Sequence, residues 1–189
     1  MTARPIRRNA QTPDILEKYV TENERLAVSR CIERQGRAFF QLAKEQELEG
    51  IVAKRKDSLY YSDKRTKDWI KIKNFVDDDF IICGYIFKEK GVISLVLAQY
   101  GTDGQLVYKG HVTMGVSGEN FQRVEKARTR KTPPFPEVPS GNERAVWLSP
   151  TLVCTVKYIA LTERGGLRHA VLKGLRADKR PEECVEPQK

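Results

Sequence analysis

Apolar and polar residues alternate in the segment WIKIKNF, which is the pattern of a β-strand with two unlike faces. The alternation places Trp69, Lys71 and Lys73 on one face and Ile70 and Ile72 on the other. An earlier segment, LEGIVAKR, shows a shorter version of the same pattern, and a charged loop rich in turn-forming residues separates the two. The pattern therefore predicts two strands, one of which carries lysines on a single face.

Longer apolar segments follow in the second part of the chain. Residues 79–90, 91–104 and 105–115 are joined by a Lys-Gly and an Asp-Gly turn, which predicts an antiparallel meander. Residues 147–161 and 166–175 return to a strand-like pattern. Five or so strands with one interposed helix are typical of an OB-fold, a small closed β-barrel that commonly binds nucleic acid.

The remaining segments show other patterns. We expect helices over 13–20, 36–50 and 117–130, a strand over 25–32, and a Pro-rich loop over 131–141. Three consecutive aspartates, residues 77 to 79, form a charged spacer that would suit a hinge between domains. Trp147 is expected in the barrel core.

Composition narrows the class of protein. The chain has 189 residues, a net charge of +9, and no apolar run of the roughly 20 residues that a membrane span needs. We therefore expect a cytoplasmic protein. The positive charge favours anionic partners such as nucleic acid or nucleotides, although many basic proteins bind nothing specific. The four cysteines are too widely spaced for a zinc site, which favours free, mostly buried thiols.

Lysines at alternate positions of one strand suit a particular chemistry. Lys71 and Lys73 would project in parallel, about 7 Å apart, and could clamp a phosphate while charge builds on it during transfer. Glu49 offers the hard oxygen ligand that Mg²⁺ prefers. A half-exposed edge strand shows the same alternation, with lysines that guard against aggregation, and Glu49 could be a solvated turn residue.

Three short segments point to a family. EGIVAK (49–54) and WIKIK (69–73) resemble motifs IV and V of ATP-dependent DNA ligases, and the stretch 148–184 resembles the end of their OB domain with motif VI. The loop between the first two segments is similar to that of bacterial ligases of the end-joining type. This resemblance implies an α+β chain: the C-terminal part of a nucleotidyltransferase (adenylation) core over residues 1–76, then an OB-fold β-barrel over 77–189.

The resemblance also implies roles for residues of the first region. Glu49 would lie near the metal and the ribose side of the nucleotide. Lys71 and Lys73 would contact the α-phosphate of ATP or AMP, and Lys54 would support this anionic site. The implied cofactors are ATP and Mg²⁺ (or Mn²⁺), and the implied partner is nicked or broken duplex DNA in repair and recombination.

Further phosphate contacts are implied outside the first region. Arg65 and Lys67, in the loop before WIKIK, would contact ATP or the DNA backbone. Arg176, Asp178 and Lys179 of motif VI would orient the pyrophosphate leaving group, and the resemblance extends this role to Arg168 and Lys173. Without the resemblance, residues 176 to 179 are equally consistent with an exposed charged loop.

One expected motif is absent from the sequence. Ligases of this family attack ATP with the lysine of a Lys-x-Asp-Gly motif, and no such motif occurs in the 189 residues. The sole Asp-Gly, at Asp103 and Gly104, is predicted in a hairpin turn. We expect the chain to begin after motif III and to be unable to adenylate itself. A second polypeptide supplying the lysine, an inactive ligase remnant and a DNA-binding module without catalysis remain as alternatives.

Overall fold

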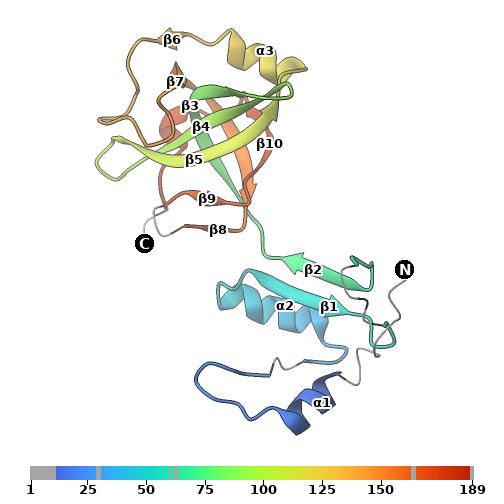
Figure 1. Cartoon of the computed structure of the whole chain (residues 1–189). Helices are drawn as coiled ribbons and strands as arrows, with labels where there is room; N and C mark the ends of the chain where they lie inside the picture. The colour runs from blue at the N-terminus through green and yellow to red at the C-terminus, as the bar shows by residue number, and fades with distance from the viewer. Residues whose placement is uncertain (1–11, 29–30, 60, 62–63, 163–164, 188–189) are drawn as a thin grey trace. The chain divides into compact units, whose positions relative to one another are not determined.

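The computed structural model describes two compact units, Met1–Asn74 and Phe75–Lys189, called here the N-terminal and C-terminal units (Figure 1). Each is described by itself. The predicted boundary lies two residues later, after residue 76. The described residues are 12–28, 31–59, 61, 64–162 and 165–187.

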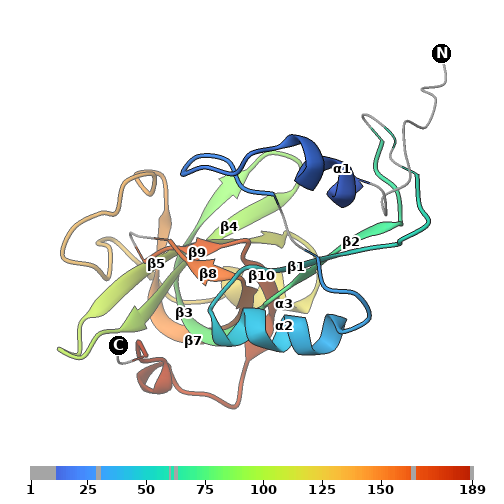
Figure 2. The same cartoon turned by 90° about the horizontal axis from the view of Figure 1, so that it is seen from below.

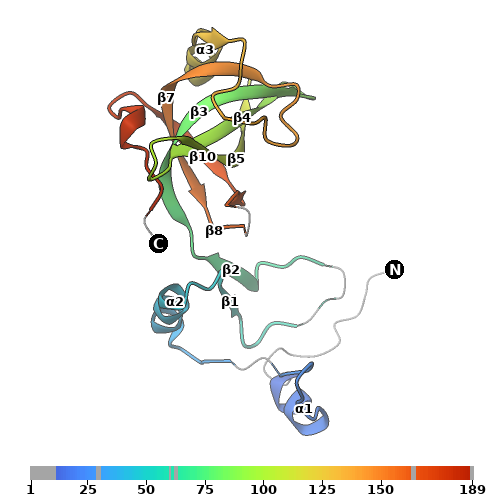
Figure 3. The ribbon, with the colours of Figure 1, turned by 90° about the vertical axis from the view of Figure 1, so that its left-hand side faces the viewer.

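Two helices and two strands make up the described part of the N-terminal unit. Both strands pair antiparallel, with Val52 opposite Lys71, and helix α2 runs beside them (Figure 3). The two predicted strands are confirmed. The elements are α1 (Thr12–Tyr19), α2 (Gly36–Glu45), β1 (Gly50–Lys54) and β2 (Trp69–Lys73).

Two predictions for this unit need correction. Helix α2 ends at Glu45 rather than continuing to residue 50, because Glu47 adopts a left-handed φ of 52°. The Leu48 amide then donates back to the Ala43 carbonyl (2.8 Å), which closes the last turn.

The strand predicted over 25–32 is wrong for the residues that the structure describes there. Only Leu26 bridges, to Asn23, because no neighbouring strand is available to extend the ladder.

A single antiparallel sheet with strand order β10-β7-β3-β4-β5 dominates the C-terminal unit. The meander of three strands is confirmed, and Lys90 and Gly91 form its first turn with φ of 63° and 66°. Strand β6 pairs with β7, and the hairpin β8–β9 lies at the opposite end of the sheet from α3 (Figures 1, 2 and 3). The bounds are β3 (Val76–Lys88), β4 (Val92–Tyr100), β5 (Leu106–Gly115), α3 (Glu119–Glu125), β6 (Thr129–Arg130), β7 (Val146–Tyr158), β8 (Ala160–Leu161), β9 (Leu167–Arg168), β10 (Val171–Arg176) and the 3-10 turn Pro181–Glu183.

The sheet is OB-like but does not close into the predicted barrel. Strand β5 approaches β9 and β10, yet no ladder joins it to either among the described residues. Closure requires a hydrogen-bonded ladder between the first and last strands of the sheet, and the described residues of β5 and β10 form none. The helix predicted over 117–130 is also shorter than expected, since its last residues form β6 instead.

Apolar side chains cover both faces of this sheet. Leu95 and Leu97 of β4 belong to one cluster of buried residues, whereas Val96 and Ala98, which point the other way, belong to a second. Trp147 lies in the second cluster, as predicted. The central strands are therefore buried on both sides.

Several smaller expectations also have outcomes. Cys83, Cys154 and Cys184 are buried, Cys31 is exposed, and all four are free thiols, as predicted. Within the described ranges, every helix is too short or too polar to cross a membrane.

The three aspartates do not form a hinge. They lie inside β3 and pair with β7, with Asp77 opposite Lys157 and Asp79 opposite Thr155. Asp79 is only 8% exposed. The hinge prediction was wrong because consecutive charged residues are usually exposed to solvent. The residues that neutralise Asp79 are distant in sequence and could not be recognised from it.

Candidate nucleotide and phosphate sites

Gly50 permits the close pairing of β1 and β2. Its φ is +143°, and a Cβ at this position would lie 2.1 Å from the Ile72 carbonyl oxygen. Only glycine fits so close to a neighbouring backbone. The Asn74 amide donates to the Glu49 carbonyl (2.8 Å) just beyond the pair. The register thus brings Glu49 to the end of β2.

A carboxylate and an ammonium group meet at this end of the two strands. Lys73 Nζ lies 3.7 Å from Glu49 Oε1, and both side chains are partly exposed. Lys71, two residues earlier on the same face, is exposed and forms no ion pair in the part of the chain that the structure describes. The pair of lysines predicted from the sequence is therefore present on one strand, beside the predicted carboxylate.

Lys54 makes a different contact. Its Nζ lies 4.1 Å from the centre of the Trp69 ring, directly across the two-stranded ladder. A cation over an indole face is stabilised by the ring quadrupole. This contact holds Lys54 and Trp69 on the face that also carries Lys71 and Lys73.

The loop between β1 and β2 is closed at its base. Arg55 donates its amide to the Asp68 carbonyl (2.8 Å), and its guanidinium lies 3.2 Å from the Asp68 carboxylate. Arg65 and Lys67 are exposed on this loop.

A second group of charges gathers in the C-terminal unit, at the end of β10. Arg176 donates to both carboxylate oxygens of Asp178, from Nε (2.8 Å) and Nη2 (2.6 Å). Such a two-point contact is the geometry that guanidinium uses for carboxylate and phosphate. Lys179 does not join Asp178 but donates to Asp79 Oδ2 at 2.8 Å.

Asp79 was not predicted as a site residue, yet it links the charges of motif VI. Its Oδ1 accepts a hydrogen bond from Thr155 (2.5 Å), and its Oδ2 accepts from Lys179 and, at 3.5 Å, from Arg176. These partners are 76, 100 and 97 residues away in sequence. The run of three aspartates is the signal in the sequence, and it predicted a hinge between domains rather than a site.

Ionisation within this group follows from the contacts. Burial opposes the charge of Asp79, but hydrogen bonds from Lys179 and Thr155 and the charges of Lys179 and Arg176 outweigh it, so its pKa is lowered. The hydrogen bonds from Arg176 lower the pKa of Asp178 to about 2. The hydrogen bond to Asp79 raises the pKa of Lys179. All these groups are charged at neutral pH.

The two other predicted contacts of this unit lie on separate elements. Arg168 ends the short strand β9, where its carbonyl accepts a hydrogen bond from the Ile159 amide (3.0 Å). Lys173 is exposed at the register shift of β10.

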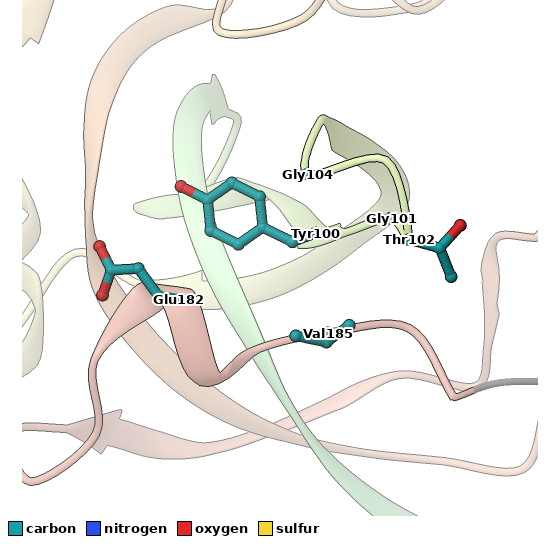
Figure 4. A pocket seen from close by; sticks show the side chains of 6 residues that line it. All are labelled: Tyr100, Gly101, Thr102, Gly104, Glu182 and Val185. Atoms are coloured by element: carbon teal, nitrogen blue, oxygen red, sulfur yellow. The ribbon is translucent and has the colours of Figure 1, made fainter.

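A hollow of about 600 Å³ lies elsewhere in the C-terminal unit (Figure 4). The backbone of Tyr100 joins its two walls, accepting from the Glu186 amide (2.9 Å) and donating to the Cys184 carbonyl (2.8 Å). No predicted site residue lines it, and its charged lining residue is Glu182, which disfavours a phosphate ligand. The lining residues are Tyr100, Gly101, Thr102, Gly104, Glu182 and Val185.

The expected Mg²⁺ would need oxygen ligands from carboxylate side chains. No group of three or more His, Cys, Asp or Glu side chains is arranged to hold a metal ion in the described ranges. Magnesium at phosphate-transfer sites often takes only one or two carboxylates, with the substrate phosphates and water filling the other positions. Glu49, a partly exposed carboxylate beside the lysine strand, fits that kind of site.

Comparison with known proteins identifies the family. Residues 8–73 match the family described as "ATP dependent DNA ligase domain", and residues 88–179 match "ATP dependent DNA ligase C terminal region". The chain belongs to the ATP-dependent DNA ligase family.

Individual relatives make the assignment more specific. The chain is 35% identical over 144 residues to the multifunctional non-homologous end joining protein LigD of Pseudomonas aeruginosa, and 30% identical over 169 residues to LigD of Mycobacterium tuberculosis. These matches cover 70% and 85% of this chain but 17% and 22% of the relatives. The chain thus spans about a fifth of the length of these curated relatives.

Solved structures agree with this assignment. The ligase domain of M. tuberculosis LigD is 26% identical, with a TM-score of 0.52 over 95% of this chain and 60% of that one. Mycobacterial DNA ligase D complexed with ATP and MES is 28% identical, with the same TM-score and coverage. These likenesses confirm the predicted α+β class, with an OB-like sheet in place of a closed barrel.

Proposed function

We propose that this chain contributes the phosphate clamp and the DNA-wrapping OB-like unit of an ATP-dependent DNA ligase that joins nicked or broken DNA in end-joining repair and recombination. The observation that carries the proposal is the β1–β2 pair. Its register places Lys71 and Lys73 on one face and brings Glu49 within 3.7 Å of Lys73. Similarity to LigD ligase domains supports the same function.

In this function the lysine strand binds the nucleotide. The ammonium groups of Lys71 and Lys73 hold the α-phosphate of ATP from one side, and their charge stabilises the negative charge that builds there. Lys54, held over the Trp69 ring, adds positive charge to the same face. Glu49 would hold Mg²⁺ (or Mn²⁺), which when bound neutralises the phosphates.

The bond-making group is proposed to come from outside these residues. A lysine nitrogen forms a bond to the α-phosphorus of ATP, the bond to the bridging oxygen breaks, and pyrophosphate leaves. The 189 residues contain no Lys-x-Asp-Gly, and we propose that this lysine is supplied from outside them, by a second polypeptide. Arg176, Asp178 and Lys179 orient the leaving pyrophosphate. Arg65, Lys67, Arg168 and Lys173 contact ATP or the DNA backbone.

Adenylation with labelled ATP tests this function. The purified chain is incubated with α-labelled ATP and Mg²⁺, alone and with an extract of its source cells, and covalent label is read on a denaturing gel. We expect no label on this chain and label on a co-purifying partner. Lys71→Gln should abolish the partner's labelling, whereas Lys44→Gln, a solvent-exposed lysine of α2, should not. Label on the chain alone would overturn the proposal.

A specific observation favours DNA binding without catalysis as a second candidate. Lys126, Arg128, Arg130 and Lys131 are exposed between α3 and the start of the Pro-rich loop, and no carboxylate pairs with them among the described residues. Pairing with β7 fixes the backbone, since the Ser149 amide donates to the Arg128 carbonyl (2.8 Å). An unneutralised basic strip of this kind attracts the phosphates of duplex DNA.

Salt dependence distinguishes this candidate. If the strip contacts one phosphate through Arg128, Arg128→Gln should reduce the slope of log K against log salt by about 0.9. Arg180→Gln removes an equally charged, exposed arginine of the same unit and should leave the slope unchanged. Binding to a nicked duplex without ATP, together with no labelled adduct under any condition, would favour this candidate over the ligase.

A further inference from the structure

We infer that Asp79 is a positioning residue that holds Arg176 and Lys179 in place to bind the pyrophosphate part of the nucleotide. The inference rests on the proposed function of motif VI and adds a residue to it. Asp79 lies in β3, and its carboxylate is the point where side chains from three separate segments meet.

The bonds of Asp79 divide between its two oxygens. Oδ1 accepts from Thr155, its direct partner across the β3–β7 ladder, which fixes the plane of the carboxylate. Oδ2 faces the cations and accepts from Lys179 (2.8 Å) and Arg176 (3.5 Å). Because Thr155 fixes one oxygen of the carboxylate, the other oxygen is a rigid hydrogen-bond acceptor for Lys179 and Arg176.

Asp79 borders the buried core of the unit. Asp79 is followed in β3 by the fully buried Phe80 and Ile81. The backbone beside it is also fixed, since Gln99 of β4 donates to both the Asp78 carboxylate (3.0 Å) and the Asp79 carbonyl (3.1 Å). By contrast, Arg176 is the last residue of β10, and Lys179 lies in the loop that follows it.

Each cation keeps donors that could reach a ligand. An ammonium group has three N–H donors and a guanidinium has five. The contacts of Lys179 described above use one, and those of Arg176 use Nε, Nη1 and Nη2 once each. Asp79 therefore orders the two side chains without exhausting their capacity to bind phosphate oxygens.

Loss of the Asp79 charge should change phosphate affinity in the direction opposite to that expected from charge alone. Removing a negative charge near a phosphate site should strengthen anion binding if charge alone matters. Removing Asp79 should instead weaken it, because Lys179 loses the carboxylate that it donates to and Arg176 keeps only its contact with Asp178. Asp77, exposed on the same strand, is the matched control since its substitution removes the same charge without touching either cation.

The test titrates inorganic tripolyphosphate into the full chain and follows the NMR signal of the Arg176 Nε–H group. We expect Asp79→Asn to raise the dissociation constant at this signal about tenfold, the loss of one charge-assisted hydrogen bond. Asp77→Asn should leave the constant unchanged or lower it slightly. Equal behaviour of the two variants, or tighter binding by Asp79→Asn, would overturn the inference.

Two further measurements keep the outcomes separate. If Asp79→Asn does not fold, Thr155→Val removes only the bond to Oδ1 and should weaken binding in the same direction by a smaller factor; unchanged binding overturns the inference. If tripolyphosphate leaves the Arg176 signal of the unaltered chain unmoved, the role proposed for motif VI fails along with it. A shift in the unaltered chain with no difference between Asp79→Asn and Asp77→Asn overturns the positioning role alone.

Discussion

The two units of this chain differ in how much apolar surface they bury. In the C-terminal unit, buried side chains lie on both faces of the sheet, and many have no exposed surface at all. In the described part of the N-terminal unit, Ala43 is the one buried apolar residue, and Ile70 of β2 is 56% exposed. One candidate phosphate site therefore stands on a packed core, whereas the other stands on two strands with little beneath them.

The difference separates two ways of fixing a cation. Asp79 fixes Lys179 through side-chain bonds anchored in a core. Lys71 and Lys73 are instead arranged by the backbone pairing of β1 and β2, which depends on the fit at Gly50, and Lys73 adds a partly exposed ion pair with Glu49.

Separating the units should have the largest effect. Residues 75–189 alone should unfold in one cooperative thermal transition, because they contain both clusters of buried side chains. Residues 1–74 alone should show no cooperative transition, since so small a core cannot offset chain entropy. Circular dichroism during heating measures both. A sharp transition from residues 1–74 would show that the N-terminal unit also has a core able to stabilise it alone.

A large apolar side chain should matter only where it is buried. Leu95→Ala, at a position with no exposed surface, should lower the free energy of unfolding by about 2–5 kcal/mol, as in other cores. Ile70→Ala, in β2, should change it by less than about 0.5 kcal/mol. Urea denaturation followed by far-ultraviolet circular dichroism gives both values. Comparable losses would show that the N-terminal unit is packed in solution.

Gly50→Ala should disrupt the N-terminal unit locally. The added methyl group would overlap the Ile72 carbonyl oxygen, so β1 and β2 must separate. The Asn74 amide, which donates to Glu49, should then exchange its hydrogen faster, whereas amides of β3 and β4 should not change. Gly36→Ala is the control because no atom lies within 4 Å of its added Cβ. Unchanged exchange at Asn74 would contradict this account of the pair.

Acid should have a smaller effect, confined to the C-terminal unit. The folded pKa of Asp79 is below its ordinary value of 3.8, so its stabilisation is present above about pH 4 and is lost as the pH falls through the folded pKa. The melting temperature should therefore drop between about pH 4 and pH 2. Asp79→Asn should lower it at neutral pH and reduce that drop, whereas Asp77→Asn should follow the unaltered chain. Parallel curves for all three proteins would contradict the assigned ion pairs.

Local signals in the sequence predicted the strands and turns well. The strand WIKIK and the Lys90-Gly91 turn are determined by residues adjacent in sequence, and both lie where the sequence predicts them. The strand predicted over 25–32 failed because alternation alone cannot provide a partner strand. The predicted closure of the barrel was wrong for a related reason. Closure requires pairing between β5 and β10, which are distant in sequence.

The site was predictable only in part. The segments carrying Glu49, Lys71 and Arg176 were recognisable as motifs, but the contacts of Asp79 join residues up to 100 positions apart. No short pattern records such a contact. The three aspartates predicted a hinge, yet the carboxylate of Asp79 is buried within a cluster of charged side chains. A carboxylate can be buried when hydrogen-bond and charge partners surround it.

The order of the elements along the chain has a consequence for inheritance. Strand β2 ends at Lys73, and β3 begins at Val76, with Asp79 a few residues further on. A single short stretch of coding sequence therefore specifies both the lysine strand and the carboxylate that holds the second group of cations. Recombination that exchanges one unit for that of a related gene must join the sequences at Asn74 or Phe75. A crossover only a few residues later, beyond Asp79, would transmit the aspartate of one ancestor with the Arg176 and Lys179 of another.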